Sequence, residues 1–213
     1  IVGCEDVTLR DSFIRASDDC VCIKAASYPD PAANRNVKNI LVEHCVLWNA
    51  EPGNAVEIGY EVRCDEISDI TFRDLDIVHC QYEGNQSGGV LTIHNADRAY
   101  IHNIVYEDIR VEDAQEKFID IKVLDSKYSL DRSRGRVEDI FFRNIEILNG
   151  NFPVSIVRGF EMHTEMSRPQ NIHFDNVVVL GEQINSPSDL HMVVELSNDI
   201  WFNGKDRVKR NPF

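Results

Sequence analysis

Residues Ile70–Ile77 read ITFRDLDI, with apolar residues at alternate positions on either side of Asp74. Alternation with a period of two is typical of β-strands, in which successive side chains point to opposite faces. Asp and Asn tolerate the left-handed backbone conformation and hydrogen-bond to their own backbone, so they suit a bend between two short strands. The segment therefore predicts two strands that meet at a corner residue, Asp74.

This pattern recurs along the chain at intervals of 30 to 36 residues. Its six copies are Val7–Ile14, Ile40–Leu47, Ile70–Ile77, Ile104–Val111, Ile140–Ile147 and Ile172–Val179. Asp, Asn or His occupies the corner position of every copy, so His44 is predicted to be a corner residue rather than a ligand. A repeat of this length indicates stacked supersecondary units that bury their apolar faces against one another.

A third alternating segment follows each copy. These segments are Cys20–Lys24, Ala55–Gly59, Val90–His94, Phe118–Lys122 and Val154–Arg158, with Met192–Glu195 as a sixth. Three short strands per repeat predict an all-β chain folded as a right-handed parallel β-helix of about six turns. We expect residues 1–213 to form a single domain, the C-terminal part of a longer β-helix, in which residues 181–213 make the last partial turn and a cap.

Composition narrows the classes of function. The formal charge of −14 argues against nucleic-acid binding, which relies on Lys and Arg patches, and no apolar run is long enough to span a membrane. The six cysteines show no Cys-x-x-Cys spacing, so we predict no zinc site; their even number permits disulfides without indicating a pairing. The first residues include neither an initiator Met nor a signal peptide, so the chain is expected to be processed or truncated.

Two adjacent carboxylates, Asp18 and Asp19, stand at the start of the strand predicted over Cys20–Lys24, which is the third strand of the first repeat. Neighbouring carboxylates repel each other, so their protonation is coupled and one pKa is expected to rise relative to the other. Hydrolysis of a glycosidic bond needs such a pair, because one carboxyl group protonates the leaving oxygen while a carboxylate activates water. The alternative is a solvated turn before a strand. The position of the pair within the repeat favours the catalytic interpretation.

The third strands of successive turns are expected to lie in register, about 4.8 Å apart. Glu57 then lies one turn from the aspartate pair and is the third catalytic candidate. Polar side chains on the same face are candidates for binding a substrate: Lys24, Asn54, Thr92, His94, Asp120, Lys122 and Arg158. An ordinary solvated face explains them equally well. Aromatic residues in or beside the long loops could stack on a sugar ring or pack the loops: Trp48, Tyr60, Tyr82 and Tyr128.

Ser17–Lys24, which reads SDDCVCIK, resembles the Asp-Asp-Cys-(Ile/Val)-Ala-Ile-Lys motif of the polygalacturonase-like enzymes of glycoside hydrolase family 28. Gly53–Gly59 stands where that family has a Gly-His-Gly motif. The resemblance spans about residues 1–180 and implies an inverting glycoside hydrolase on a β-helix, in which Asp18 is the general acid and Asp19 helps to activate water. It also implies a secreted or periplasmic protein.

The sequence departs from the family pattern at two cationic positions. Asn54 replaces the family's histidine, and Thr92-Ile93-His94 replaces the Arg-Ile-Lys motif that binds uronate carboxylates. These changes argue against polygalacturonate as the substrate. The family's third aspartate would fall just before Ile1. Gly53–Tyr60 followed by Ile70–His79 is similar to the corresponding turns of dextranase and isopullulanase, and a neutral glycan would fit that relationship.

The leading hypothesis is a glycoside hydrolase that needs no cofactor or metal and acts on a polysaccharide or oligosaccharide. Asp18 would protonate the leaving oxygen, and Asp19 would activate water together with Glu57 or with an upstream carboxylate. A non-catalytic glycan-binding or structural β-helix is the first alternative. The second is a polysaccharide lyase, in which Arg or Lys abstracts a proton and Asp18, Asp19 and Glu57 hold calcium.

Overall fold

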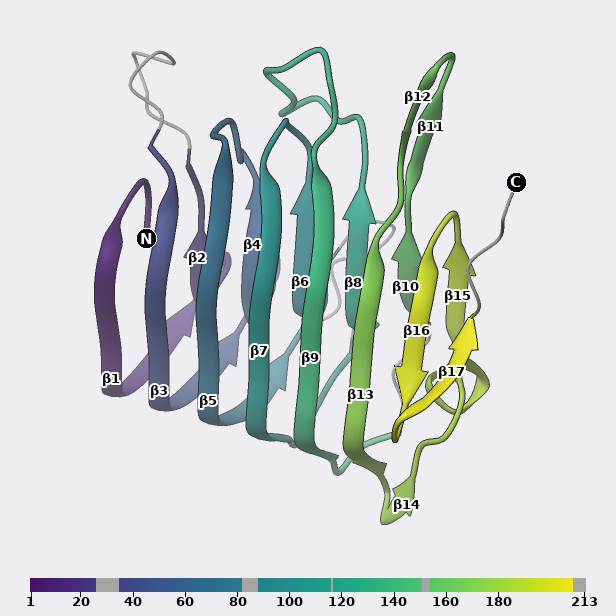
Figure 1. The fold of residues 1–213 in the computed structure, drawn as a ribbon. Helices are drawn as coiled ribbons and strands as arrows, with labels where there is room; N and C mark the ends of the chain where they lie inside the picture. Colours follow the sequence, from purple (N-terminus) through teal and green to yellow (C-terminus); the bar gives the residue numbers. More distant parts are fainter. Residues whose placement is uncertain (26–34, 82–87, 116, 151–153, 209–213) are drawn as a thin grey trace.

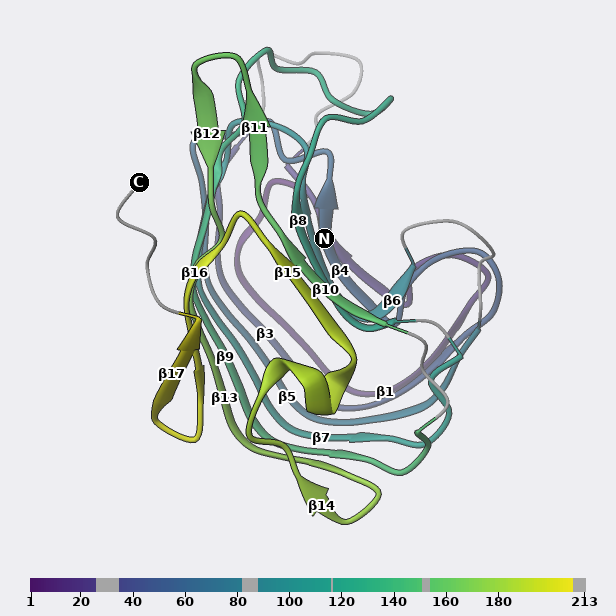
Figure 2. The same cartoon turned by 90° about the vertical axis from the view of Figure 1, so that its right-hand side faces the viewer.

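The computed structural model describes residues 1–25, 35–81, 88–115, 117–150 and 154–208, and over these residues the chain is a right-handed parallel β-helix. Figure 1 shows the strands of successive turns stacked side by side from the N-terminal turn to the C-terminal one. Figure 2 looks along the stack and shows successive turns following the same path around a common interior. The fold class that the repeat predicts is confirmed.

Two sheets form most of the wall. The larger sheet has the order β1-β3-β5-β7-β9-β13-β16-β17, and β14 pairs with β13. Its strands are β1 (Glu5–Ala16), β3 (Val37–Asn49), β5 (Glu66–Cys80), β7 (Tyr100–Val111), β9 (Arg136–Ile147), β13 (Gln170–Val179), β14 (Glu182–Gln183), β16 (Asn198–Phe202) and β17 (Lys205–Val208).

The smaller sheet has the order β15-β10-β8-β6-β4-β2. Its strands are β2 (Val21–Ile23), β4 (Val56–Tyr60), β6 (Gly89–Asn95), β8 (Lys117–Val123), β10 (Ser155–Arg158) and β15 (Met192–Glu195). A hairpin of β11 (Phe160–Met162) and β12 (Glu165–Ser167) and a 3-10 helix, η2 (Pro187–Leu190), complete the elements. Among the described residues, no helix has the length and apolar character needed to cross a membrane.

Each long strand of the larger sheet contains the first two strands predicted for its turn, which run on through the corner residue. Asp74 in β5 and His44 in β3 both have a φ of 51°. The other corner residues, Asp11, Asp108, Asn144 and Asn176, also have positive φ values. One left-handed residue turns the strand, while the residues on both sides keep their parallel pairing with the neighbouring turns. The predicted corner role of His44 is therefore confirmed.

The interior is apolar and arranged in columns. Five aromatic side chains on successive long strands form a buried ladder: Phe72, Tyr106, Phe142, Phe174 and Phe202. Adjacent ring centroids in this ladder are 4.8 to 5.0 Å apart. Stacked aromatic pairs contribute about 0.5–1.5 kcal/mol each beyond the burial of their area. The ladder thus stabilises one register of the larger sheet.

The smaller sheet aligns the third strands in the predicted register. Glu57 pairs with Cys22 on one side and with Thr92 on the other, and Thr92 pairs in turn with Asp120. Met192–Glu195 is β15 and pairs with β10. Because each strand repeats this register, ionisable side chains from distant parts of the sequence lie in one column.

Candidate functional site

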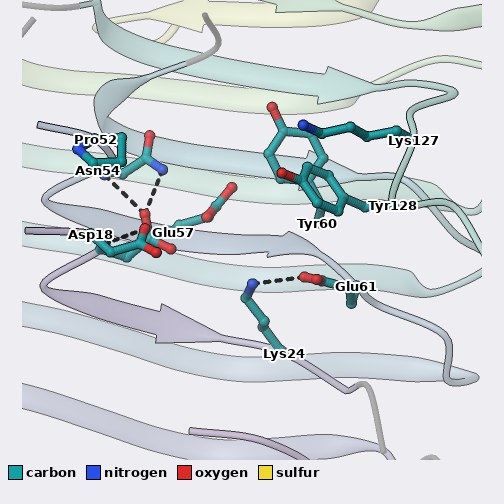
Figure 3. A pocket seen from close by; sticks show the side chains of 11 residues that line it. Asp18, Lys24, Pro52, Asn54, Glu57, Tyr60, Glu61, Lys127 and Tyr128 are labelled. Carbon is teal, nitrogen blue, oxygen red and sulfur yellow. Dashed lines mark hydrogen bonds and ion pairs between the residues drawn. The ribbon is translucent and has the colours of Figure 1, made fainter. Parts of the chain in front are cut away.

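An open pocket of about 580 Å³ lies over β2 and β4 (Figure 3). It is lined by Asp18, Asp19, Lys24, Pro52, Gly53, Asn54, Glu57, Tyr60, Glu61, Lys127 and Tyr128. The lining includes the three predicted catalytic carboxylates, two of the predicted binding residues and two of the aromatic candidates. Polar groups converging on a concave surface are typical of a small-molecule site.

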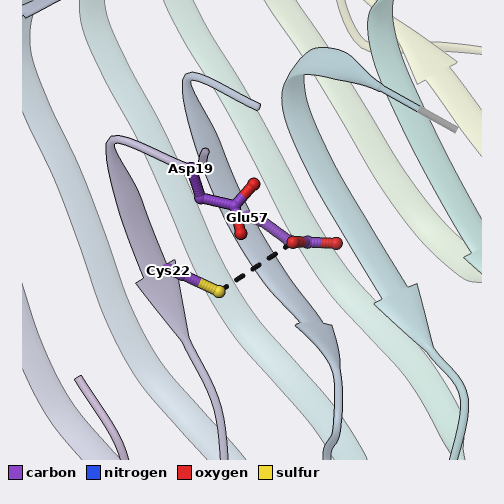
Figure 4. A group of neighbouring side chains, drawn as sticks. All are labelled: Asp19, Cys22 and Glu57. Atoms are coloured by element: carbon purple, nitrogen blue, oxygen red, sulfur yellow. Dashed lines mark hydrogen bonds between the residues drawn. The ribbon is translucent and has the colours of Figure 1, made fainter. Parts of the chain in front are cut away.

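The ends of β2 and β4 place Asp19 beside Glu57 (Figure 4). Asn54 fixes the Asp19 carboxyl group, because its backbone N–H and its side-chain Nδ2 both donate to Asp19 Oδ1, at 2.9 and 2.7 Å. Gly53 has a φ of +115°, and a Cβ atom there would lie 2.6 Å from the backbone nitrogen of Asp19. Only glycine therefore lets the next turn approach the aspartate so closely.

Asp19, Cys22 and Glu57 form a tight cluster, in which one ligand atom from each residue lies within 4.8 Å of the others. Burial, followed by the negative charge and hydrogen bond of Glu57, raises the pKa of Asp19 to about 6. Burial and the two carboxylates also raise the pKa of the Cys22 thiol far above its usual range, so this thiol stays protonated. The rise predicted for one carboxyl pKa falls on Asp19, and its charged partner is Glu57 rather than Asp18.

The oxygen donors of this cluster are too few to hold calcium by themselves. Calcium takes six to eight oxygen ligands, whereas the cluster offers two carboxyl groups and a protonated thiol. All six cysteines are free thiols. The calcium that a lyase would use therefore gains no support from these residues.

A buried chain of ionisable groups leads from the pocket into the wall of the β-helix. Glu57 Oε1 lies 2.7 Å from His94 Nδ1, and His94 Nε2 lies 3.2 Å from Asp120 Oδ2. The same Asp120 oxygen lies 2.9 Å from Lys122 Nζ and 3.6 Å from Lys117 Nζ. Only 3% of Glu57 is exposed, and His94 and Asp120 are 0% exposed. Negative and positive groups alternate along the chain, so each buried charge has a partner of opposite sign.

The pKa values along this chain follow from that alternation. Burial disfavours the imidazolium form of His94, but the carboxylates of Asp120 and Glu57 outweigh burial and raise its pKa. Burial likewise favours protonated Asp120, but His94 and the lysines outweigh it and lower the pKa of that carboxyl group. For Lys122, burial outweighs the attraction of Asp120 and lowers the pKa. His94 is thus held as a cation between two carboxylates.

Two tyrosines and an ion pair form another part of the pocket lining. The ring of Tyr60 stacks on His94, with centroids 4.5 Å apart and 28° between the planes. Tyr128 is tilted against Tyr60 at a centroid distance of 5.4 Å and is 43% exposed. Lys24 Nζ lies 2.7 Å from Glu61 Oε2. Figure 3 shows the two rings set apart from the carboxyl groups of Asp18 and Glu57.

The predicted site residues are divided between the pocket and the wall behind it. Asp18, Asp19, Lys24, Asn54 and Glu57 line the pocket. His94, Asp120 and Lys122 lie in the buried chain, and Thr92 is buried and donates its hydroxyl to the Val56 carbonyl at 3.0 Å. Arg158 pairs with Glu195 at 2.6 Å, outside the pocket lining. Much of the face expected to meet solvent is therefore buried, and the ring of Tyr60 covers His94.

The lining residues Pro52, Gly53, Glu61 and Lys127 were not predicted as site residues from the sequence, and neither was Cys22, which belongs to the carboxyl cluster but not to the lining. Cys22 shares its column with Glu57, so the register alone could have identified it. Glu61 follows the alternating segment, and Lys127 lies in the loop after β8. The alternation within a strand therefore does not predict where either side chain points. Of the other aromatic candidates, Trp48 stacks on His79 with ring centroids 5.1 Å apart and does not line the pocket. Tyr82 lies outside the described residues.

No protein-family model matches the chain, and comparisons with curated proteins and with solved structures find no match either.

Proposed function

We propose that this protein is a glycoside hydrolase that cleaves O-glycosidic bonds of a polysaccharide or oligosaccharide with inversion at the anomeric carbon. The observation that carries the proposal is the Asp19–Glu57 pair, two pocket-lining carboxyl groups of which one has its pKa raised to about 6. A carboxyl group with a raised pKa beside a second carboxyl group is typical of acid–base chemistry on glycosidic bonds. The resemblance of Ser17–Lys24 to the polygalacturonase-like family supports the same chemistry.

The Asp19–Glu57 pair suits activation of water. Its ligand atoms lie within 4.8 Å of each other. That is closer than the roughly 6.5–9.5 Å between the acid and the base of an inverting enzyme, so both groups act on one side of the sugar. A pKa near 6 makes Asp19 a stronger base than an ordinary carboxylate and still leaves it ionised at neutral pH. Water held between the two carboxylates would lose its proton to Asp19.

Asp18 is the proton donor in this proposal. It lines the same pocket but is exposed, and its Oδ1 accepts the backbone N–H of Asp19 at 2.8 Å. A bound sugar would cover this carboxyl group, and burial favours the protonated form. Asp18 then gives its proton to the leaving oxygen, while the oxygen of water adds to the anomeric carbon from the opposite face and its proton goes to Asp19.

The test is release of reducing ends from pectic, dextran-type and other neutral polysaccharides, by this chain and by the full product of its gene. We expect activity that falls on the order of 100-fold or more in Asp18→Asn and in Asp19→Asn. Proton NMR of the first product should show the inverted anomer. Variants that hydrolyse a substrate as fast as the parent would disprove the proposed roles, and a retained configuration would disprove inversion.

Glycan binding without catalysis is the second candidate function. The two tyrosines of the pocket favour it, because they could hold a sugar whether or not the carboxyl groups react. Binding of a glycan with no new reducing ends after prolonged incubation would support this alternative. A lyase has less support, because Lys24 is paired with Glu61 and Lys122 with Asp120, and Lys127 Nζ lies over the Tyr128 ring.

A further inference from the structure

We propose that the pocket selects a neutral glycan over a polyuronate, and that Tyr128, supported by Tyr60, is the platform for one of its sugar rings. This inference takes the substrate class, a glycan, from the proposed function. It concerns binding and not bond cleavage, so it can be tested in a variant that does not turn over.

The charges around the pocket disfavour an anionic sugar. Its lining contains four carboxyl groups, those of Asp18, Asp19, Glu57 and Glu61, against the ammonium groups of Lys24 and Lys127. Lys24 is already paired with Glu61 at 2.7 Å. The carboxylate of a uronate sugar would therefore enter a negative field, whereas a neutral sugar would not.

Cations behind the pocket do not change this balance. The side chains of Lys117 and Lys122 are only 7% and 12% exposed, and both face Asp120. His94 is 0% exposed and lies between Glu57 and Asp120. Each of these positive groups is thus directed at a buried carboxylate and is not available to a uronate in the pocket.

The aromatic side chains form a stack that begins in the interior and ends at the pocket. His94 covers one face of Tyr60 at 4.5 Å, and Tyr128 follows at 5.4 Å with 43% of its surface exposed. An exposed ring beside hydrogen-bonding groups offers an apolar face for the C–H groups of a pyranose. Lys127 Nζ lies 4.9 Å over the Tyr128 ring, a weak contact at an exposed site that a sugar can displace.

The loop that carries this ring is held in place before any ligand binds. Asp97, which is buried, accepts the backbone N–H groups of Leu130 and Asp131 at 2.6 and 2.7 Å through its Oδ1 atom. The Asp131 carboxylate in turn lies 3.0 Å from both Arg63 Nε and Arg98 Nη1. A glycan would therefore meet a preorganised ring, and binding would not have to order the loop.

The platform lies away from the carboxyl groups along the strand. Tyr60 follows Glu57 by three residues in β4, a distance of roughly 10 Å at about 3.3 Å per residue. A sugar stacked there is a neighbour of the sugar at the carboxyl groups. We therefore expect the pocket to bind oligosaccharides and to bind monosaccharides poorly.

The test is calorimetric titration of the Asp19→Asn variant with hexasaccharides of equal length. Neutral malto-, isomalto- and xylohexaose are compared with hexagalacturonate, and at least one neutral probe should bind about 10-fold more tightly than the uronate. Adding Tyr128→Ala should weaken that binding roughly 2- to 10-fold, whereas Tyr128→Phe should preserve it. Glu61→Gln should reduce the preference for the neutral probe, because it releases the charge of Lys24.

Leu130→Ala is the matched control, because Leu130 is exposed in the same loop but does not line the pocket. Tighter binding of hexagalacturonate, no binding of any probe, or binding that Tyr128→Ala leaves unchanged would each overturn the inference. Hydrolysis by the parent chain is measured separately. If neutral probes bind through Tyr128 and are never cleaved, the hydrolase proposal fails while the binding inference stands.

Discussion

His94 and Glu57 form an ion pair that is almost completely removed from solvent: Nδ1 lies 2.7 Å from Oε1, and the two side chains are 0% and 3% exposed. Burying such a pair costs desolvation free energy, so it is weak support for stability by itself. Its position suggests what the pair does instead. It holds Glu57 against Asp19, and the charge of Glu57 is one of the causes that raise the pKa of Asp19.

Replacing His94 by Gln should destabilise the fold by about 3–5 kcal/mol, because Glu57 and Asp120 lose the cation between them. At about 2–4 °C per kcal/mol for a domain of this size, the thermal midpoint should fall by roughly 6–20 °C. Scanning calorimetry of the parent and the variant measures this loss.

The matched control for this prediction is His102→Gln. His102 pairs with Glu66 at 2.9 Å, but the two side chains are 22% and 27% exposed. Because water and salt screen such a pair, its loss should cost no more than about 1 kcal/mol. Equal losses in the two variants would contradict the assignment of a buried cation to His94.

Hydrolysis should become faster as the pH rises through about 6. Asp19 has to be ionised to accept a proton from water, and its pKa is about 6, so the acidic limb of kcat/KM should report an apparent pKa near that value. In His94→Gln the limb should move to higher pH, since a positive charge near the carboxyl pair is lost. A rate that falls as the pH passes 6 would identify Asp19 as the proton donor instead.

The contribution of Asp19 to folding stability should fall as the pH rises, whereas the rate of hydrolysis should increase. Its pKa is raised from an ordinary value of 3.8 to about 6 in the folded chain, so the folded chain binds more protons than the unfolded chain between these values. Stability rises with pH only where the unfolded state binds more protons. The contribution of Asp19 is therefore fully present below about pH 4 and is lost as the pH rises through 6.

The Asp19→Asn variant measures this effect. Two pKa units correspond to about 3 kcal/mol at most, so the variant should be more stable than the parent at pH 8 by up to that amount and similar to it near pH 4. Urea unfolding at both pH values gives the comparison. A variant that is less stable than the parent at pH 8 would show that the carboxylate at this position is not strained by burial and by Glu57.

The repeat determines most of the fold, and the sequence shows the repeat directly. Alternating apolar residues predict the strands, and a polar residue that tolerates positive φ, such as Asp74, predicts each corner. The parity of the third strands also predicts which residues share a column, and the pairing of Glu57 with Cys22 and Thr92 follows from it. These features are local in sequence and repeated, so one turn predicts the next.

The burial of the site could not be predicted in the same way. His94 is buried partly because Tyr60 stacks on it, and Tyr128 then lies against Tyr60 from a loop of another turn. Contacts such as Asp131 with Arg63 hold that loop, and they join loop residues whose side-chain directions the alternation of the strands does not predict. The polar column was therefore predicted correctly in its register and incorrectly in its exposure to solvent.

The corner residues allow a test of the fold that does not depend on function. His44 has a φ of 51° and is 52% exposed through its side chain, so His44→Val should cost about 1–2 kcal/mol by forcing a β-branched residue into the left-handed region. His44→Asn should be nearly neutral, because Asn tolerates this conformation. Glu146→Val, at an exposed strand position that is not among the positive-φ residues, is the matched control and should not destabilise the fold comparably. Equal unfolding free energies for the His44→Val and His44→Asn variants would mean that the bend of the long strand does not require a left-handed residue.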